Sequence, residues 1–209
     1  MKHYRIPKWL KRFYPGAIWD FSFRSNSIFL TFDDGPNPST TPYLLELLDQ
    51  HQIKATFFCL GKNVQNYPEL FEMIIQNGHE VGNHSMNHPK GLHTTKHEYV
   101  QDVVSASQFI PGKLFRPPYG KIKPSQFRAL KKMGYQTIFW SVLSYDFDQK
   151  LATDEFIETM MSYCEPGSIY VFHDSDKAAK TLQHELPELI QQMKMSGYHF
   201  AKIEPGLFS

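Results

Sequence analysis

The sequence has few cysteines, no long apolar run and little net charge. Cys59 and Cys164 are its only cysteines among 209 residues, too few for the disulfide framework of a small secreted protein. No apolar run approaches the roughly 18 residues that a membrane-spanning helix needs. The formal net charge of +1 provides no global field that would attract nucleic acid. These absences favour a soluble globular protein without a nucleic-acid partner.

The N-terminus also lacks an uninterrupted apolar segment and a small-residue cleavage site, so we identify no signal peptide. We therefore expect a cytoplasmic protein. A chain of this length is typical of a single domain with one sizeable core. It contains no internal repeat and no low-complexity segment.

Residues 1–27 differ in composition from the rest, because six basic residues and seven large aromatics occur there with only one acid, Asp20. Such a mixture suits the headgroup region of an anionic membrane. Residues 1–24 would then form a membrane-surface contact that holds the protein at the inner face of the membrane. The same composition also suits an arm whose aromatics pack on the domain while its cations stay in water. Both interpretations remain open at this point.

From residue 28 onward, short apolar segments alternate with segments of helical periodicity. Such alternation predicts parallel strands joined by right-handed crossovers. We predict an α/β fold over residues 28–209, a closed or nearly closed β/α barrel of about seven parallel strands, with a doubly wound sheet as the alternative. Pro187 is expected to kink or split the last helix. The predicted strands span residues 27–32, 54–60, 79–82, 113–115, 135–142, 168–172 and 198–202. The predicted helices span residues 41–51, 69–77, 96–109, 125–133, 153–163 and 178–195.

Polar side chains follow the predicted strands at the point where each strand ends. In a parallel barrel these ends open onto one face, where active sites are built. Groups of acids, bases and a cation would therefore converge there, which solvated loops alone do not explain. The residues concerned are Asp33 and Asp34 after the first strand, Asn83 and His84 after the third, Arg116 after the fourth, Asp146 after the fifth, and His173 and Asp174 after the sixth.

A metal site is predicted from His84, His88 and one of the paired aspartates, Asp33 or Asp34. The two histidines are four residues apart, so on one helical turn both imidazoles would point to the same side. This spacing alone is weak evidence, since His93 and His97 share it, but the first pair directly follows a strand and faces the paired aspartates. Adjacent side chains in extended backbone diverge. One aspartate can therefore bind a metal while its neighbour stays free as a base.

These motifs together resemble the polysaccharide deacetylase family, also described as the NodB-homology domain or carbohydrate esterase family 4. The resemblance covers about residues 28–203, and its motifs are specific in their combination and order. They are TFDDGP at residues 31–36, HSMNH at residues 84–88, RPPYG at residues 116–120, and an apolar strand ending in His-Asp at residues 169–174.

The resemblance implies a distorted β/α barrel and a role for each site residue. Asp34, His84 and His88 would bind a divalent metal, most commonly Zn²⁺. Asp33 would act as the general base and His173 as the general acid. Arg116 would steady Asp33, Asp146 would raise the pKa of His173, and the main-chain amide of Tyr119 would help to hold the oxyanion. The substrate pocket would include Pro117, Pro118, Phe147 and Val171.

The fourth motif departs from the family, which usually has a D-x-x-D-W pattern after the fifth strand. This chain has Leu143 in place of the first acid and Phe147 in place of the tryptophan, while Asp146 is kept. Apolar and aromatic character is preserved, so a pocket for an acetyl methyl group is still expected. The missing acid affects the expected choice of substrate more than the expected chemistry.

We therefore expect a metal-dependent hydrolase that removes N-acetyl groups from an amino-sugar-containing poly- or oligosaccharide. One alternative is an enzyme that removes another acyl group, such as formyl, from a lipid-linked or small sugar. The other is an inactive sugar-binding domain. Neither the sugar nor the oligomeric state follows from the sequence.

Overall fold

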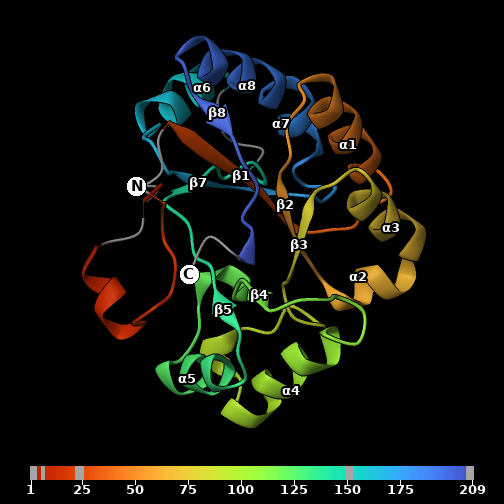
Figure 1. Cartoon of the computed structure of the whole chain (residues 1–209), viewed down its shortest axis with the longest axis vertical. Helices are drawn as coiled ribbons and strands as arrows, with labels where there is room; N and C mark the ends of the chain where they lie inside the picture. Colours follow the sequence, from red (N-terminus) through yellow and green to blue (C-terminus); the bar gives the residue numbers. More distant parts are fainter. Residues whose placement is uncertain (1–3, 6–7, 22–25, 149–152, 206–209) are drawn as a thin grey trace.

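The computed structural model describes residues 4–5, 8–21, 26–148 and 153–205. A curled parallel sheet forms its centre, with strand order β5-β4-β3-β2-β1-β7-β6, and β8 pairs with one end of β1 (Figure 1). The predicted distorted β/α barrel is thereby confirmed. The strands are β1 (Ser27–Asp34), β2 (Thr56–Cys59), β3 (Glu80–Asn83), β4 (Leu114–Phe115), β5 (Gln136–Thr137), β6 (Val142–Leu143), β7 (Ile169–His173) and β8 (His199–Phe200).

Strand β1 is central because its sequence is apolar on both faces. Six consecutive residues, from Ile28 to Asp33, are buried, as expected for a parallel strand covered on both sides. Its register with β7 pairs Asp33 with His173, and its register with β2 pairs Asp34 with Cys59. The pairing therefore brings the polar ends of the neighbouring strands to the same level.

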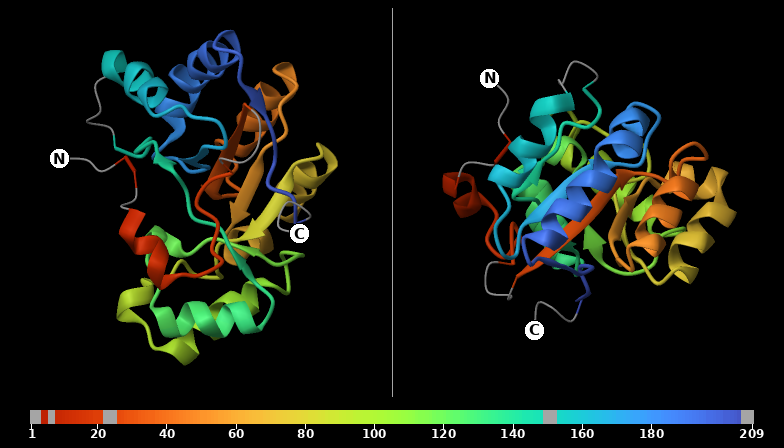
Figure 2. Two further views of the ribbon diagram at one scale, coloured as in Figure 1. Left: turned by 60° about the vertical axis from the view of Figure 1, so that its left-hand side comes forward. Right: turned by 90° about the horizontal axis from the view of Figure 1, so that it is seen from above.

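Helices surround the sheet (Figures 1 and 2). Those predicted from periodicity are present within a few residues, but α2 is an addition that the sequence did not indicate. The last predicted helix is split into α7 and α8, and Pro187 lies in the first turn of α8, where its missing amide costs nothing. The helices are α1 (Thr41–Gln50), α2 (Gly61–Asn66), α3 (Pro68–Gln76), α4 (Lys96–Ala106), α5 (Pro124–Lys132), α6 (Thr153–Ser162), α7 (Ala179–His184) and α8 (Leu186–Met195).

The segment predicted as one strand over residues 135–142 instead forms two short strands on opposite edges of the sheet. β5 pairs with β4 and β6 pairs with β7, and no ladder joins β5 to β6 within the described residues. The residues between them cross the gap, with the Ile138 amide donating to Phe115 O at 2.8 Å and the Ser141 amide donating to Ile169 O at 3.1 Å. This crossing explains why the barrel is open rather than closed.

The described part of the N-terminal arm packs on the domain. Trp19 stacks on Phe139 with ring centroids 3.9 Å apart, and Phe21 is fully buried. Ile18 forms a parallel bridge with Ile138. In contrast, Trp9 in the 3₁₀ helix η1 (Lys8–Phe13) is 62% exposed. The packed interpretation is thus confirmed for the end of the arm, while membrane contact by its beginning stays a prediction.

Within the described residues, no helix is both long enough and apolar enough to cross a membrane. Cys59 is buried, and both Cys59 and Cys164 are free thiols.

Replacing Phe32 by alanine should lower the free energy of unfolding by about 3–5 kcal/mol, because the change leaves a cavity in the core. Phe32 is fully buried and its ring lies 5.0 Å from that of Phe57 and 6.0 Å from that of Phe172. Urea unfolding followed by circular dichroism measures the change. Leu92→Ala is the control, because Leu92 is 49% exposed and should change stability by about 0.5 kcal/mol or less. Equal effects of the two substitutions would contradict the assigned core.

Candidate active site

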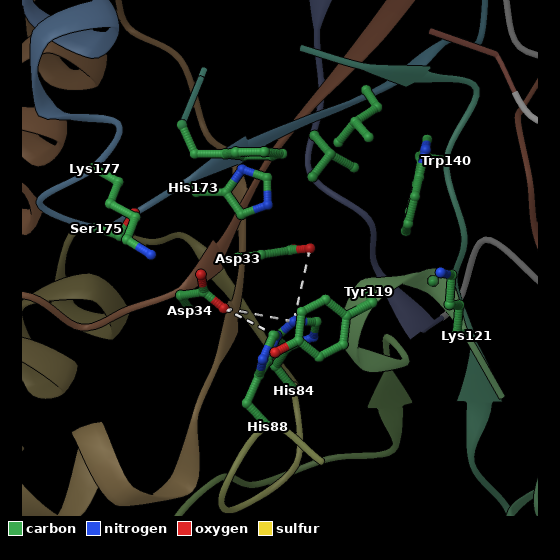
Figure 3. Close-up of a pocket in the computed structure, with 14 residues that line it drawn as sticks. Asp33, Asp34, His84, His88, Tyr119, Lys121, Trp140, His173, Ser175 and Lys177 are labelled. Atoms are coloured by element: carbon green, nitrogen blue, oxygen red, sulfur yellow. Dashed lines mark ion pairs between the residues drawn. The ribbon is translucent and has the colours of Figure 1, made fainter. Parts of the chain in front are cut away.

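A cavity of about 560 Å³ opens at the carboxyl ends of the central strands (Figure 3). Both aspartates of β1, both histidines of the loop after β3 and the histidine that ends β7 reach it, so the predicted convergence of strand ends is confirmed. The lining residues are Asp33, Asp34, His84, His88, Tyr119, Gly120, Lys121, Trp140, Leu143, Phe147, Val171, His173, Ser175 and Lys177.

Asp34, His84 and His88 form a set of three ligand atoms that lie within 4.8 Å of one another. Asp34 Oδ1 is 3.4 Å from His88 Nε2 and 3.7 Å from His84 Nε2. This buried oxygen has no hydrogen-bond partner among the described residues. The Nδ1–H of His84 can donate to Arg116 O at 2.9 Å, which leaves the Nε2 lone pair free for a cation.

The ionisation of these three residues also suits a cation. Burial lowers the pKa of His84 to about 3, helped by the nearby Arg116 charge, and burial likewise lowers the pKa of His88 to about 3. Both imidazoles are therefore neutral at neutral pH, the form that binds metals. Burial raises the pKa of Asp34 to about 6, against the opposing effect of His173. A buried carboxylate with no donor requires a positive charge beside it.

The histidines do not lie on a helical turn, so that part of the prediction is wrong. The loop after β3 has left-handed backbone at Ser85 (φ 73°) and at His88 (φ 57°). Ser85 Oγ accepts the His88 amide at 3.1 Å, and Asp102 of α4 accepts the amides of residues 86–87 at 2.8 and 3.1 Å. These side chains satisfy the backbone in place of a helix, and the imidazoles still converge with Asp34.

The other pair with the same spacing behaves differently. His93 and His97 are both exposed and neither lines the cavity. Only the pair that directly follows a strand therefore reaches the cavity.

Asp33 is held by a buried arginine. Arg116 Nη1 donates to Asp33 Oδ1 at 2.7 Å and to Thr31 Oγ1 at 2.6 Å. Its other nitrogens reach the carbonyls of Ile138 and Phe139, so the fully buried guanidinium is satisfied on several sides. The second oxygen of Asp33 lies 4.0 Å from His84 Nε2, beside the predicted metal position. The two aspartates diverge, as predicted, toward different partners.

His173 is paired with Asp146. Asp146 accepts both the His173 amide and its Nδ1–H, each at 2.7 Å. Burial opposes the charged imidazole, but the Asp146 carboxylate and its hydrogen bond, together with the charges of Asp34 and Asp33, raise the pKa of His173 to about 9. His173 is therefore protonated at neutral pH, with Nε2 free for the cavity. In the view of Figure 3, the two aspartates lie between His173 and the other two histidines.

A family model for polysaccharide deacetylases matches residues 22–138, more than half of the chain. The chain belongs to the polysaccharide deacetylase family. The resemblance read from the motifs is thereby confirmed, as is the predicted enzyme class, a hydrolase of the polysaccharide deacetylase type.

Several deacetylases are similar to this family member over most of its length. A peptidoglycan-N-acetylglucosamine deacetylase of Bacillus cereus is 31% identical over 196 residues, covering 90% of this chain and 91% of the relative. A chitooligosaccharide deacetylase of Bradyrhizobium is 37% identical over 157 residues, covering 72% and 71%. Among solved structures, a peptidoglycan N-acetylglucosamine deacetylase superposes with a TM-score of 0.83 at 28% identity and 97% coverage of both chains.

The remaining predicted site residues of this deacetylase-family chain divide into two groups. Tyr119, Phe147 and Val171 line the cavity. The Phe147 ring meets the His173 imidazole edge-to-face at 4.9 Å. Pro117 and Pro118 are buried and do not line the cavity, although they were predicted to contact substrate. They precede Tyr119, whose left-handed backbone (φ 59°) they help to fix.

The structure also shows the contacts of Asp174 and Asn63, whose roles the sequence did not reveal. Asp174 accepts the hydroxyls of Thr40 and Thr41 at 2.5 Å each. A Cβ atom at Gly35 would lie 2.1 Å from Asp174 Oδ2, so only glycine fits there. Asn63 of α2 donates to Asp34 O at 2.8 Å. Both contacts fix the backbone beside the Asp34 carboxylate.

Four further residues of the cavity were not identified from the sequence. Trp140 follows β5, and its ring packs against Gly120, where a Cβ atom would lie 2.3 Å away. Lys121, Ser175 and Lys177 also line the cavity. The signal for Trp140 was its place near the end of a predicted strand, whereas the two lysines and the serine lie in loops without a recognisable pattern.

Asp146→Asn should lower the pKa of His173 well below its wild-type value of about 9, because burial is then opposed only by the charges of Asp34 and Asp33. NMR titration of the imidazole measures this change. In the wild type, the His173–Asp146 pair stabilises the folded protein. This stabilisation is fully present below about pH 6.5 and is lost as the pH rises through about 9. Asp176→Asn, at an exposed position nearby, is the control and should leave the titration unchanged. An unchanged titration in Asp146→Asn would show that another group holds the proton.

Proposed function

We propose that this protein is a metal-dependent N-deacetylase that removes acetyl groups from an amino-sugar-containing poly- or oligosaccharide. The observation that carries the proposal is the buried Asp34 Oδ1, which lacks a donor and faces two neutral imidazoles. This donor set fits a divalent cation, most simply Zn²⁺. Three protein ligands also leave room for water and substrate, as in catalytic zinc sites.

The bound cation would polarise the acetyl carbonyl and lower the pKa of the attacking water. Asp33 would take the proton from that water. Its Oδ1 is engaged by Arg116, while Oδ2 faces the metal-binding side. The 2.7 Å ion pair with Arg116 fixes the orientation of this carboxylate, so that Oδ2 is the oxygen that would take the proton.

His173 would protonate the leaving nitrogen. An amine anion leaves poorly, so the step requires a group that still carries its proton at neutral pH. The Asp146 carboxylate provides this condition by raising the pKa of His173 to about 9. Asp146 also fixes the ring through Nδ1, so that Nε2 is the atom that donates.

The main-chain amide of Tyr119 would hold the developing oxyanion. This amide makes no hydrogen bond to the described residues. Tyr119 also lies beside the predicted metal site, because its ring centroid is 4.3 Å from that of His88. One such donor typically contributes roughly 10²–10³ in rate. The left-handed backbone of Tyr119 therefore serves to present the amide.

The acyl group would enter the apolar part of the cavity. Leu143, Val171, Trp140 and Phe147 are apolar residues that line the cavity, so a methyl group can be buried there. Leu143 replaces an acid of the usual family motif and removes a charge from this wall. The names of the relatives, which act on peptidoglycan and chitooligosaccharides, support an N-acetylglucosamine-containing substrate.

An acyl-release screen tests the substrate part of the proposal. The enzyme is incubated with chitooligosaccharides, peptidoglycan fragments and N-formylated sugars, with and without a chelator, and acetate and formate are quantified. Acetate release that stops on chelation and returns with Zn²⁺ is expected. Release of formate alone would replace the proposal by the deformylase alternative. Sugar binding without any turnover would support an inactive binding domain.

Three alanine variants test the assigned roles. His173→Ala should retain metal but lose nearly all activity, at least about 10²-fold in kcat, because general acid catalysis is lost. His84→Ala should lose both metal and activity. His93→Ala is the matched control, because this exposed histidine shares the His-x-x-x-His spacing but lies outside the cavity. Elemental analysis of the purified proteins and initial rates are the measurements. Full metal content and turnover in His84→Ala would overturn the ligand assignment.

A further inference from the structure

The charges of this nearly neutral chain are strongly segregated. Residues 1–19 and 103–145 contain twelve of the 22 basic residues and none of the 21 acidic ones. The net charge of +1 therefore arises because acidic residues elsewhere in the sequence balance these two basic segments. The mechanism uses only Arg116 from these two segments for a charge role, so the remaining cations need another explanation.

Helix α5 presents much of this charge to solvent. Arg128, Lys131 and Lys132 are exposed, and their spacing of three and four residues places them on one face. The opposite face buries Phe127 and Leu130 in the core. The following residue beyond the helix, at position 133, is an exposed methionine. The exposed face is thus basic with an apolar residue at its end.

The N-terminal arm lies against this helix, so arm and helix form one surface. Lys131 Nζ donates to Pro15 O at 2.7 Å. The Tyr14 ring meets that of Phe127 edge-to-face at 5.3 Å, and its hydroxyl donates to Ile122 O at 2.6 Å. Figure 2 shows η1 beside α5.

The arm adds exposed aromatic rings to the basic helix. Trp9 is 62% exposed and Phe13 is 55% exposed, and their rings meet edge-to-face at 6.1 Å. Lys11 and Arg12 between them are exposed. Large apolar side chains in water are unfavourable unless a partner covers them.

Few acids lie close enough to cancel this charge. Asp20 pairs with Lys11 at 2.7 Å. In the neighbouring helix α4, Glu98 caps its own helix through Thr95, and Asp102 accepts hydrogen bonds from the loop of the metal-binding histidines. The cations of α5 are therefore not neutralised by ion pairs within the described residues.

We propose that this surface docks the protein onto an anionic phospholipid bilayer. The cations would approach the lipid phosphates, while the exposed aromatics enter the boundary between headgroups and acyl chains. A soluble polyanion would use the cations but not the apolar side chains, which is why the bilayer is favoured. The basic-aromatic surface consists of Trp9, Lys11, Arg12, Phe13, Arg128, Lys131, Lys132 and Met133.

Vesicle binding of the full chain tests the electrostatic part. The protein is sedimented with vesicles of phosphatidylglycerol and phosphatidylcholine, and with vesicles of phosphatidylcholine alone. Arg128→Gln/Lys132→Gln should weaken binding to the anionic vesicles about 30-fold at low salt, from roughly fivefold for each cation near a charged membrane. Neither side chain makes a hydrogen bond or an ion pair with the described residues. Lys54→Gln/Lys180→Gln removes the same charge from exposed positions elsewhere and should leave binding nearly unchanged.

A second pair of variants tests the apolar part. Trp9→Ala/Phe13→Ala should weaken binding to anionic vesicles about tenfold or more, and the difference should persist at high salt, because it depends on buried apolar area. Met195→Ala is the control, since Met195 is 78% exposed on α8. Circular dichroism and deacetylase activity on a soluble oligosaccharide should match the wild type for all four proteins, so a loss of binding is separate from a loss of fold or function.

Three outcomes would overturn the proposal. One is equal binding to anionic and uncharged vesicles, and another is equal weakening by the control variants. The third is tight binding to soluble polyphosphate that Trp9→Ala/Phe13→Ala leaves intact, together with no vesicle binding, which would identify a polyanion site instead.

Discussion

The structure depends on the burial of one charge, the guanidinium of Arg116. A fully buried arginine costs several kcal/mol of desolvation unless its donors are satisfied. Here Asp33, Thr31 and two carbonyls of the segment that crosses the barrel gap satisfy them. The main-chain carbonyl of the same residue accepts from His84. One residue thus joins β1, β4 and the crossing segment, and at the same time orients Asp33 and His84.

Around this charge, the strand ends carry unusual backbone. Asp34, Ser85, His88, Tyr119 and Tyr145 all have positive φ without being glycine, and each follows or ends a strand of the sheet. Such conformations cost on the order of 1–3 kcal/mol each and persist only where surrounding contacts determine them. The rigid sheet and the hydrogen bonds of the loops supply those contacts. Strain is therefore concentrated where side chains or amides must be aimed into the cavity.

The sequence predicted much of this arrangement. Apolar runs located β1 and β7, and chemistry-bearing residues at strand ends located the site. Failures arose where tertiary contacts decide local structure. The His84–His88 loop is fixed by Asp102, sixteen or so residues away, and residues 135–142 divide because each half pairs with a different edge. No sequence pattern indicated that Lys177 would line the cavity. The cytoplasmic location, the native metal and the individual catalytic roles stay predictions.

The bridge from Ile18 to the crossing segment has a consequence for the chain's integrity. The Ile18 amide donates to Thr137 O, and the Ile18 carbonyl accepts from the Phe139 amide. A residue outside the family motifs thus pairs with the crossing segment as an additional strand would. Without it, unpaired backbone groups would border a cavity wall and offer a template for pairing with another copy. The segment around Ile18 therefore protects the domain against self-association, and an enzyme that lacks this segment would be expected to aggregate rather than to persist as a smaller catalyst.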